Sequence, residues 1–392
     1  LGCEIIDCGI CPTPTAQLMV KQLNAKGGII VTASHNPIEW NALKFVGAEG
    51  LFLDSEEHKL LQIELAKVRQ AAPLNSERSG QVTHLDDRIE RHIENVIALD
   101  LVNVEAIRKR RPKVVIDAIN GAGSEALPAF LERIGCEVFP INCDNDGNFV
   151  HTPEPLPENL MGLRNEVSRR GADIGIATDP DADRLAVIDE YGKPLVEEYT
   201  LVLAAYHALR HAAEGDRRPI VTNLSSTMAL DDLAQRYNRK VLRTPVGEIH
   251  VARKMQQIDS LIGGEGNGGV ILAESHLGRD SLVASGLILS LLAESGQSIR
   301  EIANDLPRYE MVKDKINVQG YEPGDILKAL AEKYASLSPN LEDGVKISWK
   351  DRWVHFRASN TEPIVRIFAE GSSQTVAASL VKEFKTEIQN LM

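Results

Sequence analysis

The feature that most constrains the fold of this chain is a pattern that recurs three times along it. In each copy an apolar, strand-like run leads into a short polar loop, and a second apolar run follows the loop. The three loops occupy residues 32–37, 179–184 and 263–269. Stretches with helical periodicity lie between them, at residues 125–134, 160–169 and 200–213. This alternation predicts α/β layers whose loops lie at strand ends, where open α/β sheets bind ligands.

The last part of the chain has a different pattern. Beyond Pro307, the strand-like runs Val345–Ile347 and Ile364–Phe368 precede one long helical stretch, Thr375–Asn390. A chain of 392 residues is also too long for one hydrophobic core. We therefore predict an α/β protein in which three related α/β domains with mixed sheets are followed by a smaller C-terminal α+β domain. The predicted domains span residues 1–103, 104–196, 197–310 and 311–392.

Composition excludes several classes of function. The net charge is −13, with 56 acidic and 43 basic residues, so a surface that follows nucleic-acid phosphates is not expected. No run of about 18 apolar residues occurs, so no membrane-spanning segment is predicted. Five cysteines, an odd number, are typical of reduced thiols in a cytoplasmic protein. The sequence has neither a signal-peptide pattern nor an initiator methionine, so we expect its true start to be missing.

The first loop contains a candidate nucleophile. Its sequence, Thr-Ala-Ser-His-Asn-Pro, places Ser34 on a turn at the end of a strand-like run. A serine in that position is exposed and can attack an electrophile once its proton is removed. An ordinary turn rich in serine and asparagine is the alternative interpretation when this loop is taken alone.

The second loop contains a candidate metal site. Its sequence, Asp-Pro-Asp-Ala-Asp-Arg, carries Asp179, Asp181 and Asp183 at alternate positions, a hard oxygen set suited to Mg²⁺. The spacing also matches a calcium-binding EF-hand, but Arg184 stands where that loop requires glycine, and both flanks are strand-like. Arg184 is instead suited to hold a phosphate against the metal. A solvated acidic turn is the plain alternative.

Two further loops have side chains suited to sugar and phosphate. Gly263–Gly269 fits a glycine pattern of dinucleotide-binding proteins, but a strand-like run follows it instead of a helix. Its Glu265 and Asn267 can face a polyol. Arg357–Pro363, with Arg366 beyond it, combines hydroxyls, an amide and guanidinium groups into an anion cradle. Plain turns are the alternatives for both loops.

A nicotinamide-dependent oxidoreductase is the alternative from another class of enzyme. Gly121–Ala126 follows a strand-like run, opens a helical pattern and fits the dinucleotide-binding glycine pattern, with Asp144 further on. Pro128 falls inside the expected helix and argues against this interpretation. The interpretation also leaves the other four loops without a role.

Taken together and in this order, the four loops resemble those of the α-D-phosphohexomutase superfamily, which includes phosphoglucomutase, phosphomannomutase and phosphoglucosamine mutase. The motifs Thr-Ala-Ser-His-Asn-Pro and Asp-Pro-Asp-Ala-Asp-Arg are highly specific, and the resemblance covers nearly the whole chain. It implies an intramolecular phosphotransferase that interconverts hexose 1-phosphate and hexose 6-phosphate of glucosamine, glucose or mannose. The implied reaction uses Mg²⁺, a phosphoserine and a hexose 1,6-bisphosphate intermediate. The implied partner is a small phosphosugar, and a homo-oligomer is compatible with it.

The resemblance also implies roles for individual residues. Ser34 would carry the phosphoryl group and bind Mg²⁺ together with Asp179, Asp181 and Asp183. Lys44 would be the general acid and base, and Arg184 would lie beside the phosphoryl group. The residues assigned to substrate binding are His35, Glu265, Asn267, Arg357, Ser359, Asn360, Thr361 and Arg366.

The chain departs from the family pattern in two places. Family members begin with a Gly-Thr-Asp-Gly-Ile-Arg-Gly loop whose arginine helps to hold phosphate, and this sequence begins after that loop. Glu248 stands where some relatives carry a histidine that contacts substrate, whereas the Gly-Glu-Gly-Asn-Gly-Gly loop resembles archaeal members. A non-catalytic phosphosugar-binding relative is a further alternative, and it would bind ligand without phosphorylation of Ser34.

Overall fold

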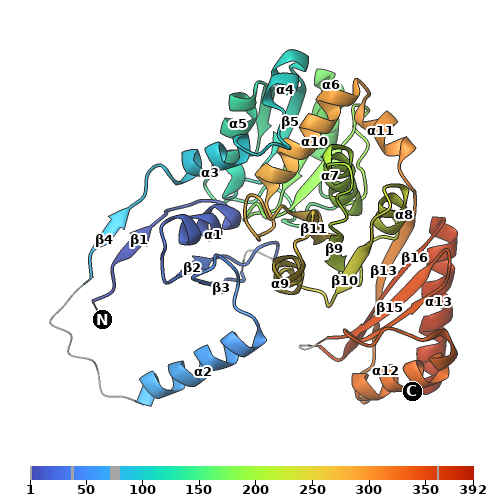
Figure 1. The fold of residues 1–392 in the computed structure, drawn as a ribbon. Helices are drawn as coiled ribbons and strands as arrows, with labels where there is room; N and C mark the ends of the chain where they lie inside the picture. Colours follow the sequence, from blue (N-terminus) through green and yellow to red (C-terminus); the bar gives the residue numbers. More distant parts are fainter. Residues whose placement is uncertain (1, 37–38, 71–79, 360–361) are drawn as a thin grey trace.

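Two four-stranded sheets with the same topology form the centre of the molecule (Figure 1). The computed structural model describes residues 2–36, 39–70, 80–359 and 362–392. One sheet has the strand order β6-β5-β7-β8 and the other β10-β9-β11-β12; in each, the first three strands are parallel and the last is antiparallel. The strands are β5 (Lys113–Asp117), β6 (Glu137–Ile141), β7 (Ile174–Thr178), β8 (Leu185–Ile188), β9 (Ile220–Asn223), β10 (Val241–Thr244), β11 (Ile262–Glu265) and β12 (Gly269–Ile271).

Helices cover both sheets, as the alternating pattern of the sequence predicts. The helices of these two units are α4 (Val104–Arg110), α5 (Gly123–Ile134), α6 (Met161–Arg170), α7 (Glu198–His211), α8 (Ala229–Arg236), α9 (Glu248–Ile258), α10 (Ser281–Ser295) and α11 (Ile299–Asp305). Helix α10 is apolar on all sides and packs against α7, α4 and α3, so it lies inside the largest core cluster. Among the described helices none is by itself long and apolar enough to cross a membrane; α10 and α11 reach that length only as a pair bent by 90°.

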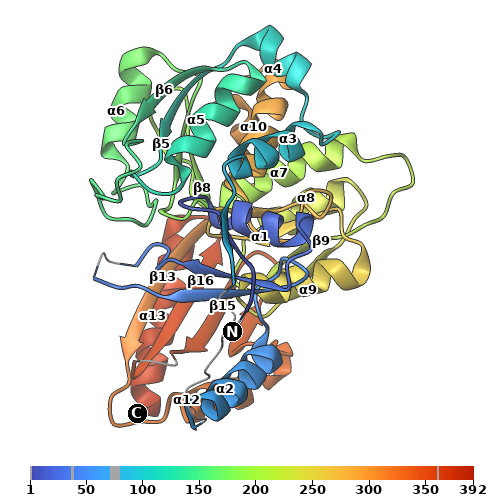
Figure 2. The same cartoon turned by 90° about the vertical axis from the view of Figure 1, so that its left-hand side faces the viewer.

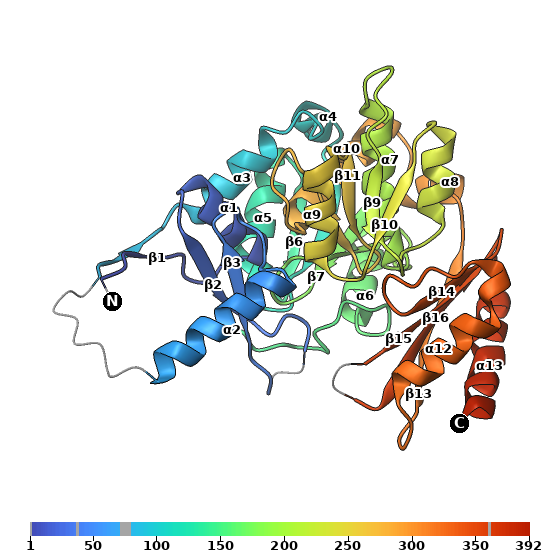
Figure 3. The same cartoon turned by 60° about the horizontal axis from the view of Figure 1, so that its bottom comes forward.

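The N-terminal unit is built differently from the other two α/β units. Its strands form two separate pairs, β1 (Ile5–Asp7) with β4 (Val82–His84) in parallel and β2 (Gly27–Val31) with β3 (Leu43–Gly47) in antiparallel. Its helices are α1 (Thr13–Gln22), α2 (Ser55–Gln70) and α3 (Arg88–Ile97), and α2 projects away from the rest of the molecule (Figures 1 and 3). The expectation of a third sheet like the other two therefore does not match the hydrogen bonding of this unit.

The C-terminal unit is an antiparallel sheet with helices, and Figure 2 shows it in red beneath the α/β units. The order is β13-β16-β15-β14, with helices α12 (Pro323–Lys333) and α13 (Gln374–Leu391). The strands are β13 (Glu310–Asn317), β14 (Val345–Ser348), β15 (Trp353–Ala358) and β16 (Ile364–Gly371). Buried polar contacts join it to the third α/β unit: Lys346 Nζ donates to the Leu224 carbonyl at 2.5 Å, and Ser225 Oγ lies 2.8 Å from His355 Nδ1.

The helix expected over residues 125–134 is confirmed as α5, and Pro128 lies inside it without interrupting it. One local expectation was wrong. The glycine-rich segment is shorter as a loop than expected, because Gly263–Glu265 pairs with Gly269–Ile271 in an antiparallel ladder. Only residues 266–268 are left to make the turn between β11 and β12.

Candidate active site

The serine loop lies against the acidic loop, although 145 positions separate Ser34 from Asp179. Ser34 follows β2, and its backbone N–H donates to Thr32 Oγ1 at 2.9 Å. Its φ of 51° lies in the left-handed region, which non-glycine residues rarely adopt and which is often found at functional sites. In this conformation Ser34 Oγ donates to Asp179 Oδ2 at 3.2 Å and lies 3.3 Å from His35 Nδ1. The serine hydroxyl is therefore held at the acidic loop.

The acidic loop is the tight turn between β7 and β8. Its aspartates Asp179, Asp181 and Asp183 are buried, and one oxygen of each lies within 4.8 Å of the others. Burial together with the charges of the other two aspartates raises the pKa of Asp179 well above its ordinary value. Three buried carboxylates this close repel one another unless cations compensate their charge.

Several groups on this loop are suited to Mg²⁺. In the described part of the chain, Oδ1 of Asp181 and Oδ1 of Asp183 are buried without a hydrogen-bond partner. Such oxygens are the ligands that Mg²⁺ prefers, so the donor set fits this ion. Asp181 Oδ2 already accepts hydrogen bonds from Thr13 Oγ1 at 2.7 Å and from Lys44 Nζ at 2.6 Å. These contacts fix the orientation of the carboxylate whose other oxygen is available.

The basic residues predicted for the site lie around these carboxylates. Lys44, on β3, forms ion pairs with Asp181 and, at 3.5 Å, with Asp183. Burial lowers the pKa of Lys44, but the two carboxylates outweigh burial and raise it above its ordinary value. Arg184 Nε lies 3.7 Å from Asp179 Oδ2 and 3.8 Å from Asp183 Oδ1. Burial and the Arg184 guanidinium lower the pKa of His35 to about 4, so its imidazole is neutral at pH 7.

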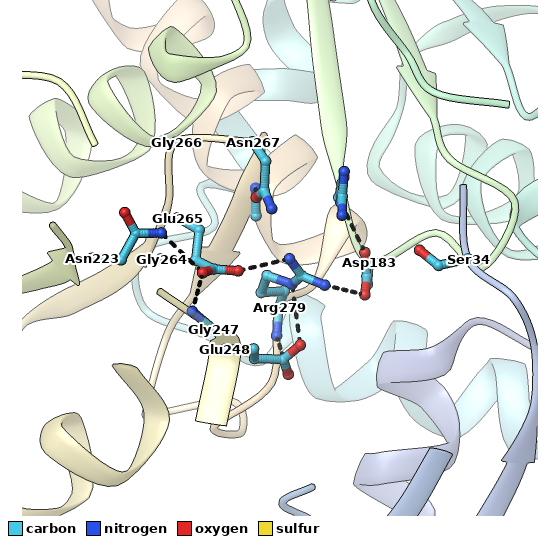
Figure 4. Close-up of polar contacts among 12 residues, drawn as sticks. Ser34, Asp183, Asn223, Gly247, Glu248, Gly264, Glu265, Gly266, Asn267 and Arg279 are labelled. Atoms are coloured by element: carbon cyan, nitrogen blue, oxygen red, sulfur yellow. Dashed lines mark hydrogen bonds and ion pairs between the residues drawn. The ribbon is translucent and has the colours of Figure 1, made fainter. Parts of the chain in front are cut away.

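Arg279 is one of the residues of this site that the sequence did not reveal (Figure 4). Its Nη2 donates to Asp183 Oδ2 at 2.6 Å and its Nη1 donates to Glu265 Oε2 at 2.8 Å. Its Nε lies 3.1 Å from Glu248 Oε2. The guanidinium therefore joins the acidic loop to the glycine-rich loop. It lies between β12 and α10 in a segment without a recognisable motif, so only the tertiary fold brings it here.

Glu265 of the glycine-rich turn and Asp183 of the acidic loop lie on opposite sides of the Arg279 guanidinium, and Asn267 lies above it (Figure 4). Glu265 Oε1 accepts hydrogen bonds from Asn223 Nδ2 and from the Gly247 backbone, both at 2.9 Å. Among the residues that the structure describes, Asn267 Oδ1 accepts a single hydrogen bond, from the Gly269 backbone N–H at 3.3 Å. Gly268 has a φ of 91°, and its carbonyl accepts from the Leu185 N–H at 3.0 Å, which ties this turn to β8.

A buried cluster anchors the segment that carries Arg279. The Asp280 carboxylate accepts from two α10 backbone N–H groups and contacts His92 Nε2 at 2.7 Å and His276 Nε2 at 3.0 Å. Ser281 Oγ donates to the Ala182 carbonyl of the acidic loop at 2.6 Å. Because His92 lies on α3, this cluster also links α10 to the N-terminal unit.

The fourth loop is described in part. Arg357 lies on β15 opposite Arg366 on β16, and its Nε is 2.8 Å from Asp343 Oδ2. The Ser359 N–H donates to the Ile364 carbonyl at 3.1 Å, and Ser359 Oγ accepts from the Glu362 backbone. Asn360 and Thr361, which were also assigned to phosphate binding, lie outside the described residues, as does Pro37 of the serine loop.

A cavity of about 610 Å³ opens beside the serine loop. Its lining comes from the serine loop and from the segment before α6: His35, Asn36, Glu39, Phe149, His151, Thr152, Pro153 and Glu154. Cavities of roughly 300–1,000 Å³ are typical of small-molecule sites. A phosphorylated hexose is within this range of sizes.

The glycine turn that suggested a dinucleotide site has another role. A Cβ at Gly121 would lie 2.5 Å from the Pro180 carbonyl oxygen, and the Ala122 N–H donates to that oxygen at 2.7 Å. The glycines thus let the turn before α5 pack directly on the acidic loop. A pyrophosphate would have to occupy the space that Pro180 fills, so this turn does not have the geometry of a nucleotide cradle.

Comparison with known proteins agrees with this geometry. Models of the phosphoglucomutase/phosphomannomutase family match four consecutive parts of the chain: alpha/beta/alpha domain I at residues 1–72, domain II at 90–192, domain III at 197–309 and the C-terminal domain at 315–387. The chain therefore belongs to the phosphoglucomutase/phosphomannomutase family, which is part of the superfamily that the sequence motifs resemble.

Individual relatives have different substrates in their names. A phosphoglucomutase/phosphomannomutase of Thermococcus kodakarensis is 41% identical, covering 96% of this chain and 81% of the relative. A phosphoglucosamine/phosphogalactosamine mutase of Sulfurisphaera tokodaii is 33% identical over 99% of this chain and 86% of its own. The crystal structure of a family protein from Burkholderia thailandensis superposes with a TM-score of 0.82 at 25% identity, covering 99% of this chain and 83% of that one.

Proposed function

We propose that this protein is a phosphohexomutase, an isomerase that moves a phosphoryl group between the 1- and 6-oxygens of a hexose phosphate. The observation that carries the proposal is the position of Ser34, whose Oγ is held 3.2 Å from Asp179 in a strained turn. Lys44 and Arg184 supply positive charge at the same place. A hydroxyl in such surroundings is suited to accept and release a phosphoryl group.

In the proposed reaction, phosphorylated Ser34 gives its phosphoryl group to the free hydroxyl of a bound hexose monophosphate. The bond between phosphorus and Ser34 Oγ breaks as a bond from phosphorus to the sugar oxygen forms, which yields a hexose 1,6-bisphosphate. The bisphosphate then turns around in the site, and Ser34 recovers the phosphoryl group from the other end. The serine ends the cycle in the state in which it began.

The residues around the serine have distinct proposed roles in this cycle. The proton lost by the sugar hydroxyl has to reach the serine oxygen, and we assign this transfer to Lys44, whose Nζ lies 2.6 Å from Asp181 Oδ2 in the acidic loop beside Ser34. Arg184 would orient the phosphoryl group. When bound to Asp179, Asp181, Asp183 and a phosphoserine oxygen, Mg²⁺ would offset the charge on that group.

The sugar and the distal phosphate are assigned to the other loops. Glu265 and Asn267 would bind the sugar hydroxyls, and His35 lines the cavity beside the serine. Arg357, Ser359, Asn360, Thr361 and Arg366 would hold the phosphate that is not reacting. Arg357 already pairs with Asp343, whose Oδ2 also accepts from the Val246 N–H at 2.9 Å, so phosphate would compete with this carboxylate for the guanidinium.

The decisive test is a coupled assay with the 1-phosphates of glucosamine, glucose and mannose, combined with intact mass measurement. Active protein should carry one phosphoryl group and convert at least one of these sugars. Ser34→Ala should lack both the added mass and the activity, whereas Ser372→Ala, a change at an exposed serine, should retain both. Full mutase activity in Ser34→Ala would refute the proposal, and tight phosphosugar binding without phosphorylation or turnover would favour a non-catalytic binding protein.

A further inference from the structure

A third cluster of metal-ligating side chains lies far from the acidic loop, after the acidic loop itself and the buried cluster around Asp280. It consists of His207 and His211, one helical turn apart on α7, and of Glu294 on the neighbouring helix α10. One ligand atom of each residue lies within 4.8 Å of the others. Helix α10 begins at the acidic loop, where Ser281 Oγ donates to the Ala182 carbonyl. Glu294 lies thirteen residues further along the same helix, so it is about 20 Å from Ser281.

The protonation of His207 is fixed by its surroundings. Its side chain is fully buried, and Nε2 lies 2.8 Å from the Leu101 carbonyl, to which it must donate. The proton is therefore on Nε2, and Nδ1 carries a lone pair that has no hydrogen-bond partner among the described residues. A neutral imidazole with one N–H bound to a backbone carbonyl is the form in which histidine binds metals.

The other two ligands have matching support. Glu294 Oε2 lies 2.7 Å from His211 Nε2, while Glu294 Oε1 accepts from Asn103 Nδ2 at 2.7 Å. The two imidazole rings lie 4.6 Å apart, and the His211 side chain is 38% exposed, which provides a path from solvent. Outer contacts like those of Leu101 and Asn103 orient the ligands of metal sites.

The two helices also favour a cation at this position. Thr200 Oγ1 donates to the Leu185 carbonyl next to the acidic loop, so α7 begins at the same end of the molecule as α10. His211 ends α7, and Glu294 lies in the last turn of α10. Helix C-termini carry partial negative charge, so both helix dipoles stabilise positive charge here.

We propose that His207, His211 and Glu294 form a binding site for a transition-metal dication, with Zn²⁺ as the best match. Two imidazoles and one carboxylate are a donor set that Zn²⁺ uses, with water as the fourth ligand, whereas Mg²⁺ prefers oxygen ligands alone. The ion would replace the contact between His211 and Glu294. It would fasten α7 to α10 and, through Leu101 and Asn103, to the segment between α3 and α4.

The test is calorimetric titration of the chelator-treated full chain with Zn²⁺ in the presence of excess Mg²⁺, which occupies the acidic loop. Wild-type protein should bind one more equivalent of Zn²⁺ than His211→Ala or Glu294→Gln, or bind it at least tenfold more tightly. In Asn103→Ser, the serine hydroxyl can still accept the backbone hydrogen bond at the start of α4, but it is too short to reach Glu294. This variant should therefore bind Zn²⁺ roughly 10–100-fold more weakly than wild type. His58→Ala, at an exposed histidine of α2, is the matched control and should bind like wild type.

A spectroscopic measurement identifies the ligands. Co²⁺ in place of Zn²⁺ should give the visible absorption of a four-coordinate site in wild type and His58→Ala, and lose it in His211→Ala. Zn²⁺ should also raise the Tm of wild type but not of His211→Ala. If the wild type and both ligand variants bind Zn²⁺ with the same stoichiometry and affinity, or if the Co²⁺ spectrum shows thiolate ligands, the proposed site does not exist. These outcomes do not depend on mutase activity.

Discussion

Replacing Arg279 with methionine should destabilise the protein because it removes one cation from three buried carboxylates. The guanidinium contacts Asp183 at 2.6 Å, Glu265 at 2.8 Å and Glu248 at 3.1 Å, and its side chain is 8% exposed. Breaking a buried ion pair by removing one partner costs about 3–5 kcal/mol. Three pairs share this cation and are not additive, so we expect a total near the upper end of that range.

The expected loss of about 5 kcal/mol corresponds to a Tm lower by roughly 10–20 °C, at the roughly 2–4 °C for each kcal/mol that is typical of domains of about 150–250 residues. Thermal unfolding in chelator, followed by circular dichroism, measures it. Arg169→Met is the matched control, because Arg169 pairs with Glu166 at the surface with its side chain 66% exposed, and its loss should cost less than about 1 kcal/mol. Added Mg²⁺ should restore part of the Tm of Arg279→Met, since it compensates Asp183.

An Arg279→Met protein with the same Tm as Arg169→Met would refute this reasoning. It would mean that the three carboxylates become protonated or hydrated at little cost when the guanidinium is absent. Arg279→Lys separates the two contributions of the residue, since it keeps the charge but loses the fork geometry, and should lie between the wild type and Arg279→Met.

Three further predictions concern the metal, the pH and the distal phosphate. Asp181→Asn should weaken the dependence on Mg²⁺ and lower the mutase rate together. Each effect should exceed the roughly 10–100-fold cost of losing a residue that only orients a metal ligand. Titrating the rate with Mg²⁺ measures both effects, and an unchanged titration would mean that the acidic loop has only a structural role. Burial raises the pKa of Glu198 from 4.5 to about 8, although Lys313 opposes the shift. Between about pH 4.5 and about pH 8, the folded state therefore keeps a proton that the unfolded state has lost. The free energy of unfolding should fall across this range by up to about 1.4 kcal/mol per pH unit and should be level above it. Glu198→Gln should lack this fall in denaturation measured at about pH 5 and about pH 9; identical profiles would contradict the assignment. Arg357→Ala should raise KM for the sugar 1-phosphate roughly ten- to 150-fold, as expected for loss of a charge-assisted contact of about 1.5–3 kcal/mol. The variant should also release free hexose bisphosphate into solution. If KM and bisphosphate release both stay at wild-type values, this arginine does not bind the distal phosphate.

The sequence predicted that the serine loop and the acidic loop share one site only through their resemblance to the family. Ser34 follows β2 and the three aspartates lie between β7 and β8, and these strands belong to different sheets, so strand pairing alone does not bring the two loops together. The α/β class and the C-terminal α+β unit were predicted from the hydrophobic patterns of the chain and are confirmed. The catalytic and binding roles of these residues remain predictions.

Long-range contacts of single residues could not be predicted in this way. Arg279 and Thr13 stand in segments without a motif, and each contacts the acidic loop only because helices α10 and α1 begin beside it. Glu248 was noted only as a departure from the family, and the structure shows it buried against Arg279. The separate strand pairs of the N-terminal unit were also missed, because hydrophobic periodicity indicates strands but not their partners.

The packing around the glycine-rich turn limits which of its positions can be changed in the laboratory to test the proposed sugar contact of Asn267. Cβ atoms at Gly266 and Gly269 would collide with the side chains of Glu198 and Arg279, and one at Gly268 would collide with the Leu185 carbonyl. A randomised library over this turn would therefore consist mostly of misfolded clones. Position 267 is the productive one to vary, and exchange of the whole turn between relatives should succeed only if the residue at 279 is exchanged with it.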